Sequence, residues 1–236
     1  MSEESPVFEA LDDVPVAGNR CLEAGAGVGN ATAALQSMDA ADIVAITNER
    51  EHATGVRTRF EGDDPSVVLA DLRSIPLERD SVTVLTAHAL FNVVPPSAVP
   101  TILAEFTRVA EPGAWLVVDD YDPVPDASLR ALFAMENATA ELSSGEPALT
   151  FYPADHLRRL VVADGWELVR ERTLLDPVPW TTELLDAHAE LARETAATLP
   201  DALASAVASE VAKRRRALGD GVETGRMYSL LFRLPE

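Results

Sequence analysis

The chain has 236 residues, enough for one sizeable α/β domain or for one domain with an inserted cap. Its formal net charge is −20, from 39 acidic and 19 basic residues, which makes it a poor general nucleic-acid binder because phosphate contacts need a basic surface. The single cysteine, Cys21, excludes an intramolecular disulfide and a zinc site built from clustered cysteines.

Composition also predicts where the protein works. The segment Met1–Ser5 is acidic and lacks the basic and apolar regions of a signal peptide, and no apolar run approaches the ~18 residues of a membrane span. These features predict a cytoplasmic protein without a membrane partner. Lys213 is the only lysine, so the basic residues are nearly all arginines. Acidic residues spread along the whole chain, with arginine replacing lysine, predict adaptation to a cytoplasm of molar salt.

Strands and helices alternate along the chain, which predicts a mostly parallel sheet with helices on both faces. Unbroken apolar runs such as 43–46 are typical of strands buried on both faces. The predicted strands are 20–23, 43–46, 67–70, 82–86, 115–119, 166–174 and 227–234. The predicted helices are 30–37, 49–60, 95–109, 127–142, 153–163 and, broken at Leu199-Pro200, 181–218.

A glycine-rich turn joins the first predicted strand to the first predicted helix. Glu23 is followed by Gly25, Gly27 and Gly29, and a helix begins at Asn30. Glycine permits the tight backbone and the close approach of a ligand that such a turn needs. A dinucleotide loop, G-x-G-x-x-G, would require glycine or alanine at the sixth position of the pattern, and Asn30 (counting from Gly25) or Thr32 (counting from Gly27) stands there instead. An acid before the glycines suits a ligand with a cationic group.

The pattern E-x-G-x-G-x-G resembles motif I of the class I S-adenosylmethionine-dependent methyltransferases. Two further segments, 71–77 and 105–114, resemble elements of that family after the third strand and before the fifth, and 152–166 resembles the entry to the sixth. The resemblance implies a Rossmann-like, doubly wound seven-stranded sheet with the last strand antiparallel. It also implies one methyltransferase domain over residues 1–236, with a helical cap at 181–219 inserted before the last strand.

The resemblance implies a site for S-adenosylmethionine at the carboxyl ends of the first strands. Glu23 would bind the amino end of the cofactor and the three glycines would lie against it. The ribose would be held by Glu49, with Thr47 as a secondary contact, although Glu49 would also suit a helix start. Asp71 and the Leu72 backbone would hold the adenine edge. Thr86, Ala87 and His88 would lie near the transferred methyl.

His88 is the candidate general base, because the unperturbed pKa of histidine lies near neutrality. A histidine that only shapes the pocket is the alternative. Asp119, Asp120 and Tyr121 also face the substrate side, where they could orient an acceptor or bind a cation. The other three histidines have no metal-ligand spacing, so we expect no metal site. A nicotinamide-dependent oxidoreductase is disfavoured, because no tyrosine is followed by the lysine of a Tyr-x-x-x-Lys pair.

The sequence therefore predicts methyl transfer to a small-molecule acceptor that it does not identify, and it carries no signal of the oligomeric state. Two alternatives stay open. One is a non-catalytic cofactor-binding protein on the same fold, since no acid stands at position 47. The other is an RNA or protein acceptor, which only the run Lys213–Arg216 supports. That run also suits a solvated helix face balanced by Glu210 and Asp220.

Overall fold

The computed structural model describes residues 5–60 and 65–236; most of the N-terminal segment considered above, residues 1–4, lies outside this part. A seven-stranded sheet has the order β3-β2-β1-β4-β5-β9-β6, and β9 runs antiparallel to both of its neighbours. The predicted doubly wound sheet with an antiparallel last strand is confirmed. The strands are β1 Arg20–Ala24, β2 Asp42–Thr47, β3 Ser66–Leu69, β4 Val82–His88, β5 Ala110–Tyr121, β6 Glu167–Leu175 and β9 Met227–Arg233.

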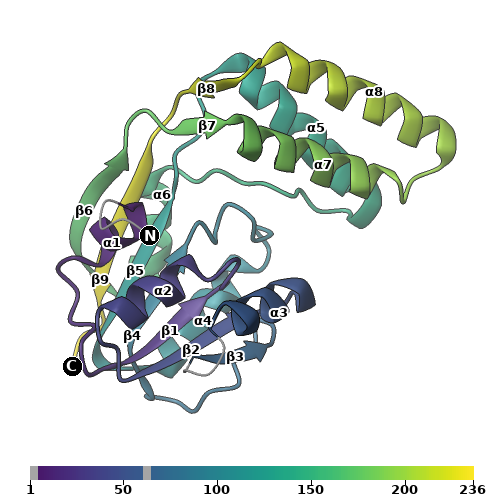
Figure 1. Cartoon of the computed structure of the whole chain (residues 1–236). Coiled ribbons are helices and arrows are strands. Elements are labelled where there is room, and N and C mark those ends of the chain that lie inside the picture. The colour runs from purple at the N-terminus through teal and green to yellow at the C-terminus, as the bar shows by residue number, and fades with distance from the viewer. Residues whose placement is uncertain (1–4, 61–64) are drawn as a thin grey trace.

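Helices cover both faces of this sheet, and each face has its own apolar core. The first core joins α1 and α2 to one face, and the second joins α4 and α6 to the other. Helix α3 packs on β2 and β3 (Figure 1). The helices are α1 Pro6–Leu11, α2 Asn30–Ser37, α3 Arg50–Arg59, α4 Val99–Val109, α5 Ala127–Ser144, α6 Ala154–Ala163, α7 Thr182–Ala196 and α8 Asp201–Ala217.

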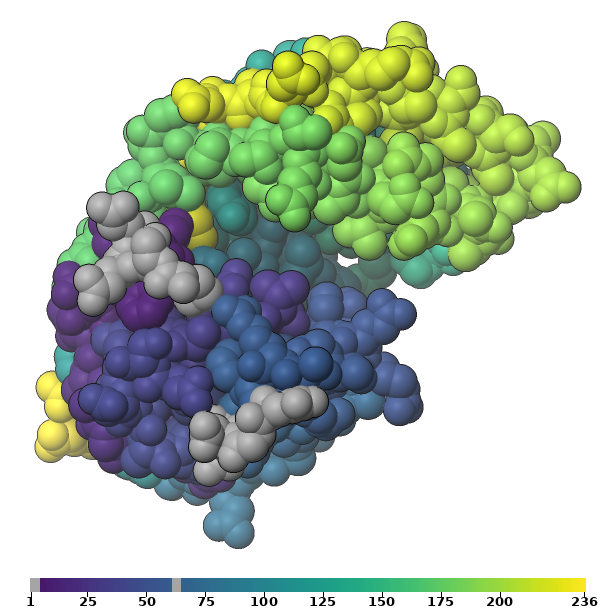
Figure 2. All heavy atoms as spheres, in the orientation of Figure 1, coloured from purple at the N-terminus to yellow at the C-terminus, as the bar shows by residue number. Residues whose placement is uncertain are grey.

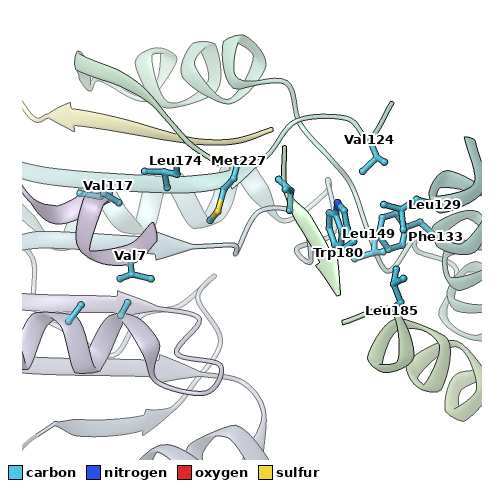
Figure 3. Packing of buried hydrophobic residues seen from close by; sticks show 14 of the residues in the cluster. Val7, Val117, Val124, Leu129, Phe133, Leu149, Leu174, Trp180, Leu185 and Met227 are labelled. Atoms are coloured by element: carbon cyan, nitrogen blue, oxygen red, sulfur yellow. The ribbon is translucent and has the colours of Figure 1, made fainter. Parts of the chain in front are cut away.

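A helical cap projects from the carboxyl-terminal end of the sheet. Helices α7 and α8 fall within the predicted insertion, and α5 packs against both, so the cap contains one helix more than expected (Figure 1). A small sheet of β7 Pro179–Thr181 and β8 Gly221–Glu223, which was not predicted, ties the two ends of the α7–α8 segment together. Trp180 and Phe133 lie in the interior of the cap, with Leu149 and Leu185 beside them (Figure 3).

One predicted strand boundary is wrong. The fifth strand was predicted over 115–119, but β5 runs without a break from Ala110 to Tyr121 and includes Glu111-Pro112-Gly113. Its pairing with β4 shifts between Val82 and Val84, whose partners are Ala110 and Trp115. The extra residues form a bulge, in which Gly113 adopts a φ of +81°. Proline and glycine therefore mark an irregularity inside the strand and not its boundary.

The two segments that carry the methyltransferase-like motifs at 71–77 and 105–114 are bonded to each other. Glu105 accepts a hydrogen bond from the Ile75 backbone N–H at 2.8 Å. Arg108 donates to the carbonyl oxygens of Ile75 and Leu77 at 2.8 and 2.9 Å, and its guanidinium also bonds Glu105. These bonds fix the loop that follows β3 to helix α4, on the side of the sheet that carries Asp71.

Candidate active site

The glycine turn forms the floor of the candidate site. Gly25, Gly27 and Gly29 have φ angles of +77°, +46° and +79°, in the left-handed region where a side chain is strained. The backbone N–H groups of Gly25 and Ala26 donate to the Ile46 carbonyl at 2.9 and 2.8 Å, which ties the turn to β2. The turn therefore presents bare backbone at the carboxyl ends of two neighbouring strands, as expected.

Glu23 lies on β1 directly before this turn. Its side chain is buried, with 3% exposed, and it accepts a hydrogen bond from the Thr32 hydroxyl of α2. Burial raises the pKa of Glu23 to about 7, while the Thr32 bond and the nearby His88 partly oppose that rise. A carboxylate that is costly to ionise in the free protein gains most from a cationic partner.

Two adjoining cavities of about 350 and 380 Å³ lie over the glycine turn, within the size range of small-molecule sites. Together they are called the cleft here. Figure 2 shows the surface hollowed between the cap and the part of the molecule that carries α2 and α3. Both cavities are lined by Gly25, Thr47, Asn48, Glu49, Leu90 and Val93. Glu23 and His88 line one of them, and Asp71, Leu72 and Arg73 line the other.

The two ribose candidates both reach the cleft. Thr47 is the buried last residue of β2, and its hydroxyl accepts a hydrogen bond from the Glu49 N–H at 3.2 Å. Glu49 is the residue before the first turn of α3, so it also occupies the helix start considered for it. Its exposed carboxylate lies 3.4 Å from His52 Nδ1. The structure places both side chains at the cleft. The assignment of Glu49 as the main ribose ligand, with Thr47 as a secondary contact, stays a prediction.

Asp71 faces the second cavity, where it has a partner that the sequence analysis did not consider. The Arg73 guanidinium lies 2.6 Å from its carboxylate, and the Arg73 backbone N–H donates to it at 2.8 Å. These bonds hold the pKa of Asp71 below its usual range. Leu72 is buried beside it. An adenine edge would therefore meet the Leu72 backbone and the Asp71 carboxylate, which is already paired with Arg73.

Of the three residues predicted at the end of β4, one lines the cleft. Thr86 and Ala87 are buried at 1% and 0% exposure, and neither is among the lining residues of the described chain. Successive side chains of a strand point to opposite faces, so Ala87 packs into the second core while His88 points to the other face. His88 reaches the cleft, and its Nδ1 lies 3.2 Å from Asp119 Oδ2.

The sequence analysis missed the loop that follows β4. Leu90 and Val93 line both cavities, and Ala89 adopts a φ of +48°. Asp120 holds this loop, because its buried carboxylate accepts the Asn92 N–H at 3.0 Å; burial raises the pKa of Asp120 to about 7. The sequence contained one signal for this loop, the acids Asp119 and Asp120 at the end of β5. The sequence analysis related these acids only to the substrate.

Other predicted features can be placed as well. Cys21 is buried, and burial raises the pKa of its thiol to about 12. In the basic run, Lys213 and Arg214 pair with Glu210, as considered above, and Arg215 pairs with Asp186 of α7, which the sequence analysis did not consider. Among residues 5–60 and 65–236 there is no cluster of three metal-ligating side chains. No helix in that same part is long and apolar enough to cross a membrane.

Comparison with known proteins agrees with this geometry. Residues 22–118 match the sequence model of a family described as a methyltransferase domain. A demethylmenaquinone methyltransferase of Clavibacter sepedonicus is 37% identical over 115 residues, which are 47% of this chain and 45% of that relative. The chain thus matches less than half the length of that relative. The family match ends before the cap.

Solved structures show the same fold over nearly the whole chain. An S-adenosylmethionine-dependent methyltransferase of Mesorhizobium loti has a TM-score of 0.60 and 13% identity, covering 97% of this chain and 98% of that one. The cyclase SpnF has a TM-score of 0.65 and 18% identity, covering 98% and 80%. The comparisons do not bear out the expected salt adaptation.

Proposed function

Because residues 22–118 match the model of a methyltransferase-domain family and the chain has the fold of solved methyltransferase structures, we propose that it transfers a methyl group from S-adenosylmethionine to a small-molecule acceptor. The observation that carries the proposal is the buried Glu23 carboxylate beside three glycines of positive φ, at the carboxyl ends of parallel strands. Ligands of α/β sheets bind at this edge. The choice of S-adenosylmethionine as the cofactor agrees with the family match. The small-molecule class of the acceptor is our proposal.

The residues of the cleft fit S-adenosylmethionine. Glu23 would bind the amino group, and the backbone of the glycine turn would lie along the cofactor. Glu49, with Thr47, would hold the ribose, and Asp71 with the Leu72 backbone would bind the adenine edge. When bound, S-adenosylmethionine supplies the methyl group, as its carbon–sulfur bond breaks with the electron pair going to sulfur. The enzyme must then hold the acceptor in line with that bond.

A small acceptor is supported by the cap. Helices α5, α7 and α8 stand over the end of the sheet that carries the cleft, which limits the space available to a large acceptor (Figure 2). The related demethylmenaquinone methyltransferase is named for a small molecule, but its match covers only 47% of this chain. We therefore assign the class of acceptor and not its identity, and we place the reaction in the cytoplasm.

Calorimetric titration with S-adenosylhomocysteine tests the cofactor site without requiring an acceptor. We expect one binding event per chain, and Glu23→Gln should weaken it at least tenfold because the amino group loses its counter-charge. Glu141→Gln, an exposed change on α5 away from the cleft, is the matched control and should bind as wild type does. Equal affinities of wild type and Glu23→Gln would contradict the role given to Glu23.

The alternative of cofactor binding without methyl transfer rests on one observation. The residue at the end of β2 is Thr47, and the first carboxylate after it in the sequence is that of Glu49, which is exposed and two residues further on. Binding of S-adenosylhomocysteine without turnover of S-adenosylmethionine, against a broad panel of acceptors, would favour this alternative.

A further inference from the structure

His88 and Asp119 form a pair at the edge of the cleft. They are register partners on the adjacent parallel strands β4 and β5, so their side chains emerge side by side on one face of the sheet. His88 Nδ1 lies 3.2 Å from Asp119 Oδ2. The Asp119 side chain is 1% exposed, whereas the His88 side chain is 21% exposed and lines the cleft. The aspartate is thus inside the protein and the histidine stands between it and the ligand space.

This geometry determines which nitrogen of the imidazole carries the proton. An ionised carboxylate only accepts hydrogen bonds, so the Nδ1 that faces Asp119 must be the N–H nitrogen of the neutral ring. The other nitrogen, Nε2, then carries a free lone pair. Within the described residues, Nε2 has no hydrogen-bond partner in the protein. The lone pair is therefore available to a molecule in the cleft.

The position of Asp119 is rigid. It lies on a central strand between β4 and β9, and its backbone carbonyl accepts the Ala89 N–H at 2.8 Å. On the β9 side it is opposite the fully buried Ser229. A carboxylate fixed in this way restricts the ring orientation of the histidine it bonds.

We propose that Asp119 is a positioning residue that holds His88 as the general base for the acceptor, which makes the acceptor a hydroxyl or amine that loses a proton. This inference rests on the proposed function. The nucleophilic atom forms its bond to the methyl carbon, the electron pair of the broken bond stays on sulfur, and the acceptor proton moves to His88 Nε2. The imidazolium that results faces Asp119, which stabilises its charge.

Two further carboxyl groups lie near this pair. Glu23 of β1 lines the same cavity as His88. Asp120 follows Asp119 on β5, and its carboxylate accepts the Asn92 N–H in the loop after β4. Burial raises the pKa of each of these two carboxyls to about 7, and the nearby His88 partly opposes that rise. Among the described residues, Asp119 is the carboxyl that is bonded to the ring.

The tautomer of His88 tests the positioning role without an acceptor. We would label the histidines of the full chain with ¹⁵N and record long-range spectra in the presence of S-adenosylhomocysteine, at a pH where the ring is neutral. His88→Gln identifies the signal. Wild type should show the Nδ1–H tautomer, and Asp119→Asn should convert it to Nε2–H, because the amide N–H then donates to Nδ1. Wild-type His88 in the Nε2–H tautomer would overturn the proposal.

The cap contains a matched control. His188 Nδ1 lies 2.9 Å from Glu136 Oε2, so it has the same chemistry away from the cleft. Its signal should stay unchanged in Asp119→Asn, whereas Glu136→Gln should convert His188 and leave His88 alone. Asp119→Asn should also retain its affinity for S-adenosylhomocysteine. Lack of binding by the wild type would instead count against the proposed function.

The base role is tested with phenols and alkylamines of graded acidity as probes, with labelled S-adenosylmethionine as donor. His88→Gln should slow methylation most for the least acidic phenols, which need a base, and least for phenols already ionised in solution. Equal slowing of all probes would overturn the base role. If wild type binds S-adenosylhomocysteine and methylates none of the probes, the assigned acceptor class is wrong.

Discussion

Leu90, in the loop after β4, packs against Gly25, so that a Cβ at position 25 would lie 2.6 Å from Leu90 Cδ1. The glycine is therefore required twice, by its φ of +77° and by this contact. Leu90 also lines both cavities of the cleft, so the same contact sets the distance between the floor of the site and the loop above it.

The first prediction concerns Gly25→Ala. We expect it to weaken binding of S-adenosylhomocysteine at least tenfold, because the added methyl displaces Leu90 into the ligand space. Gly18→Ala is the matched control: its φ is +73°, nothing lies within 4 Å of the added Cβ, and it is remote from the cleft. Both changes should cost ~1–2 kcal/mol of stability from backbone strain. Calorimetry and urea unfolding separate the two effects, and equal loss of affinity in both variants would refute the role of Leu90.

The second prediction concerns pH and Glu23. The pKa of Glu23 is raised from 4.5 to about 7, so between these values the folded chain holds a proton that the unfolded chain releases. The free energy of unfolding therefore falls as pH rises through this window, by about 1.4 kcal/mol for each unit of the pKa difference. Asp120 adds to the fall, because burial raises its pKa from 3.8 to about 7.

Glu23→Gln removes the Glu23 contribution. Its stability relative to wild type should rise with pH from 4.5 and level off above about 7. Urea unfolding across this pH range measures the difference, with Glu141→Gln as the control that should follow the wild-type slope. A constant difference between Glu23→Gln and wild type would mean that Glu23 ionises normally.

The third prediction concerns the bonds between α4 and the loop after β3. Arg108→Ala removes the guanidinium that donates to the Ile75 and Leu77 carbonyls and to the Glu105 carboxylate. We expect a loss of about 2–3 kcal/mol of unfolding free energy, since hydrogen bonds to a charged group are among the stronger ones. Because Glu105 also bonds the Ile75 N–H, the Glu105→Ala and Arg108→Ala effects should not add in the double variant. Strict additivity would show that the bonds act independently.

The fourth prediction separates the cap from the cofactor site. The ring centroid of Trp180 lies 5.4 Å from that of Tyr121 and 5.2 Å from that of Phe133. The Trp180 Nε1–H donates to the Thr224 carbonyl at 3.1 Å. Trp180→Ala should cost about 3–5 kcal/mol, and Trp180→Phe less. In the described part of the chain, neither α7 nor α8 lines the cleft, so affinity for S-adenosylhomocysteine should persist. Its loss in Trp180→Phe would show that the cap shapes the cofactor site.

Much of the sheet was predictable because its signals are local. Buried parallel strands are continuous apolar runs, and helix α2 has the predicted bounds of Asn30 and Ser37. The glycine turn was readable because its function depends on neighbours in sequence. The bulge at Gly113 was not, since proline and glycine mark a turn and a bulge alike, and only the pairing with β4 distinguishes them.

The rest of the site depends on contacts distant in sequence. His88 and Asp119 are 31 positions apart, and only the register of β4 against β5 brings them together. The contact of Leu90 with Gly25 also joins two segments far apart in the sequence and has no periodic signal. Likewise, α5 reads as an ordinary helix, and its membership of the cap follows from its packing against α7 and α8.

A crystal structure of the chain with S-adenosylhomocysteine tests the central claim most directly. The account predicts that the ligand lies across Gly25, Gly27 and Gly29, with its amino group within hydrogen-bond distance of the Glu23 carboxylate and its sulfur on the side of His88. A ligand bound elsewhere, or one whose amino group makes no contact with Glu23, would contradict it.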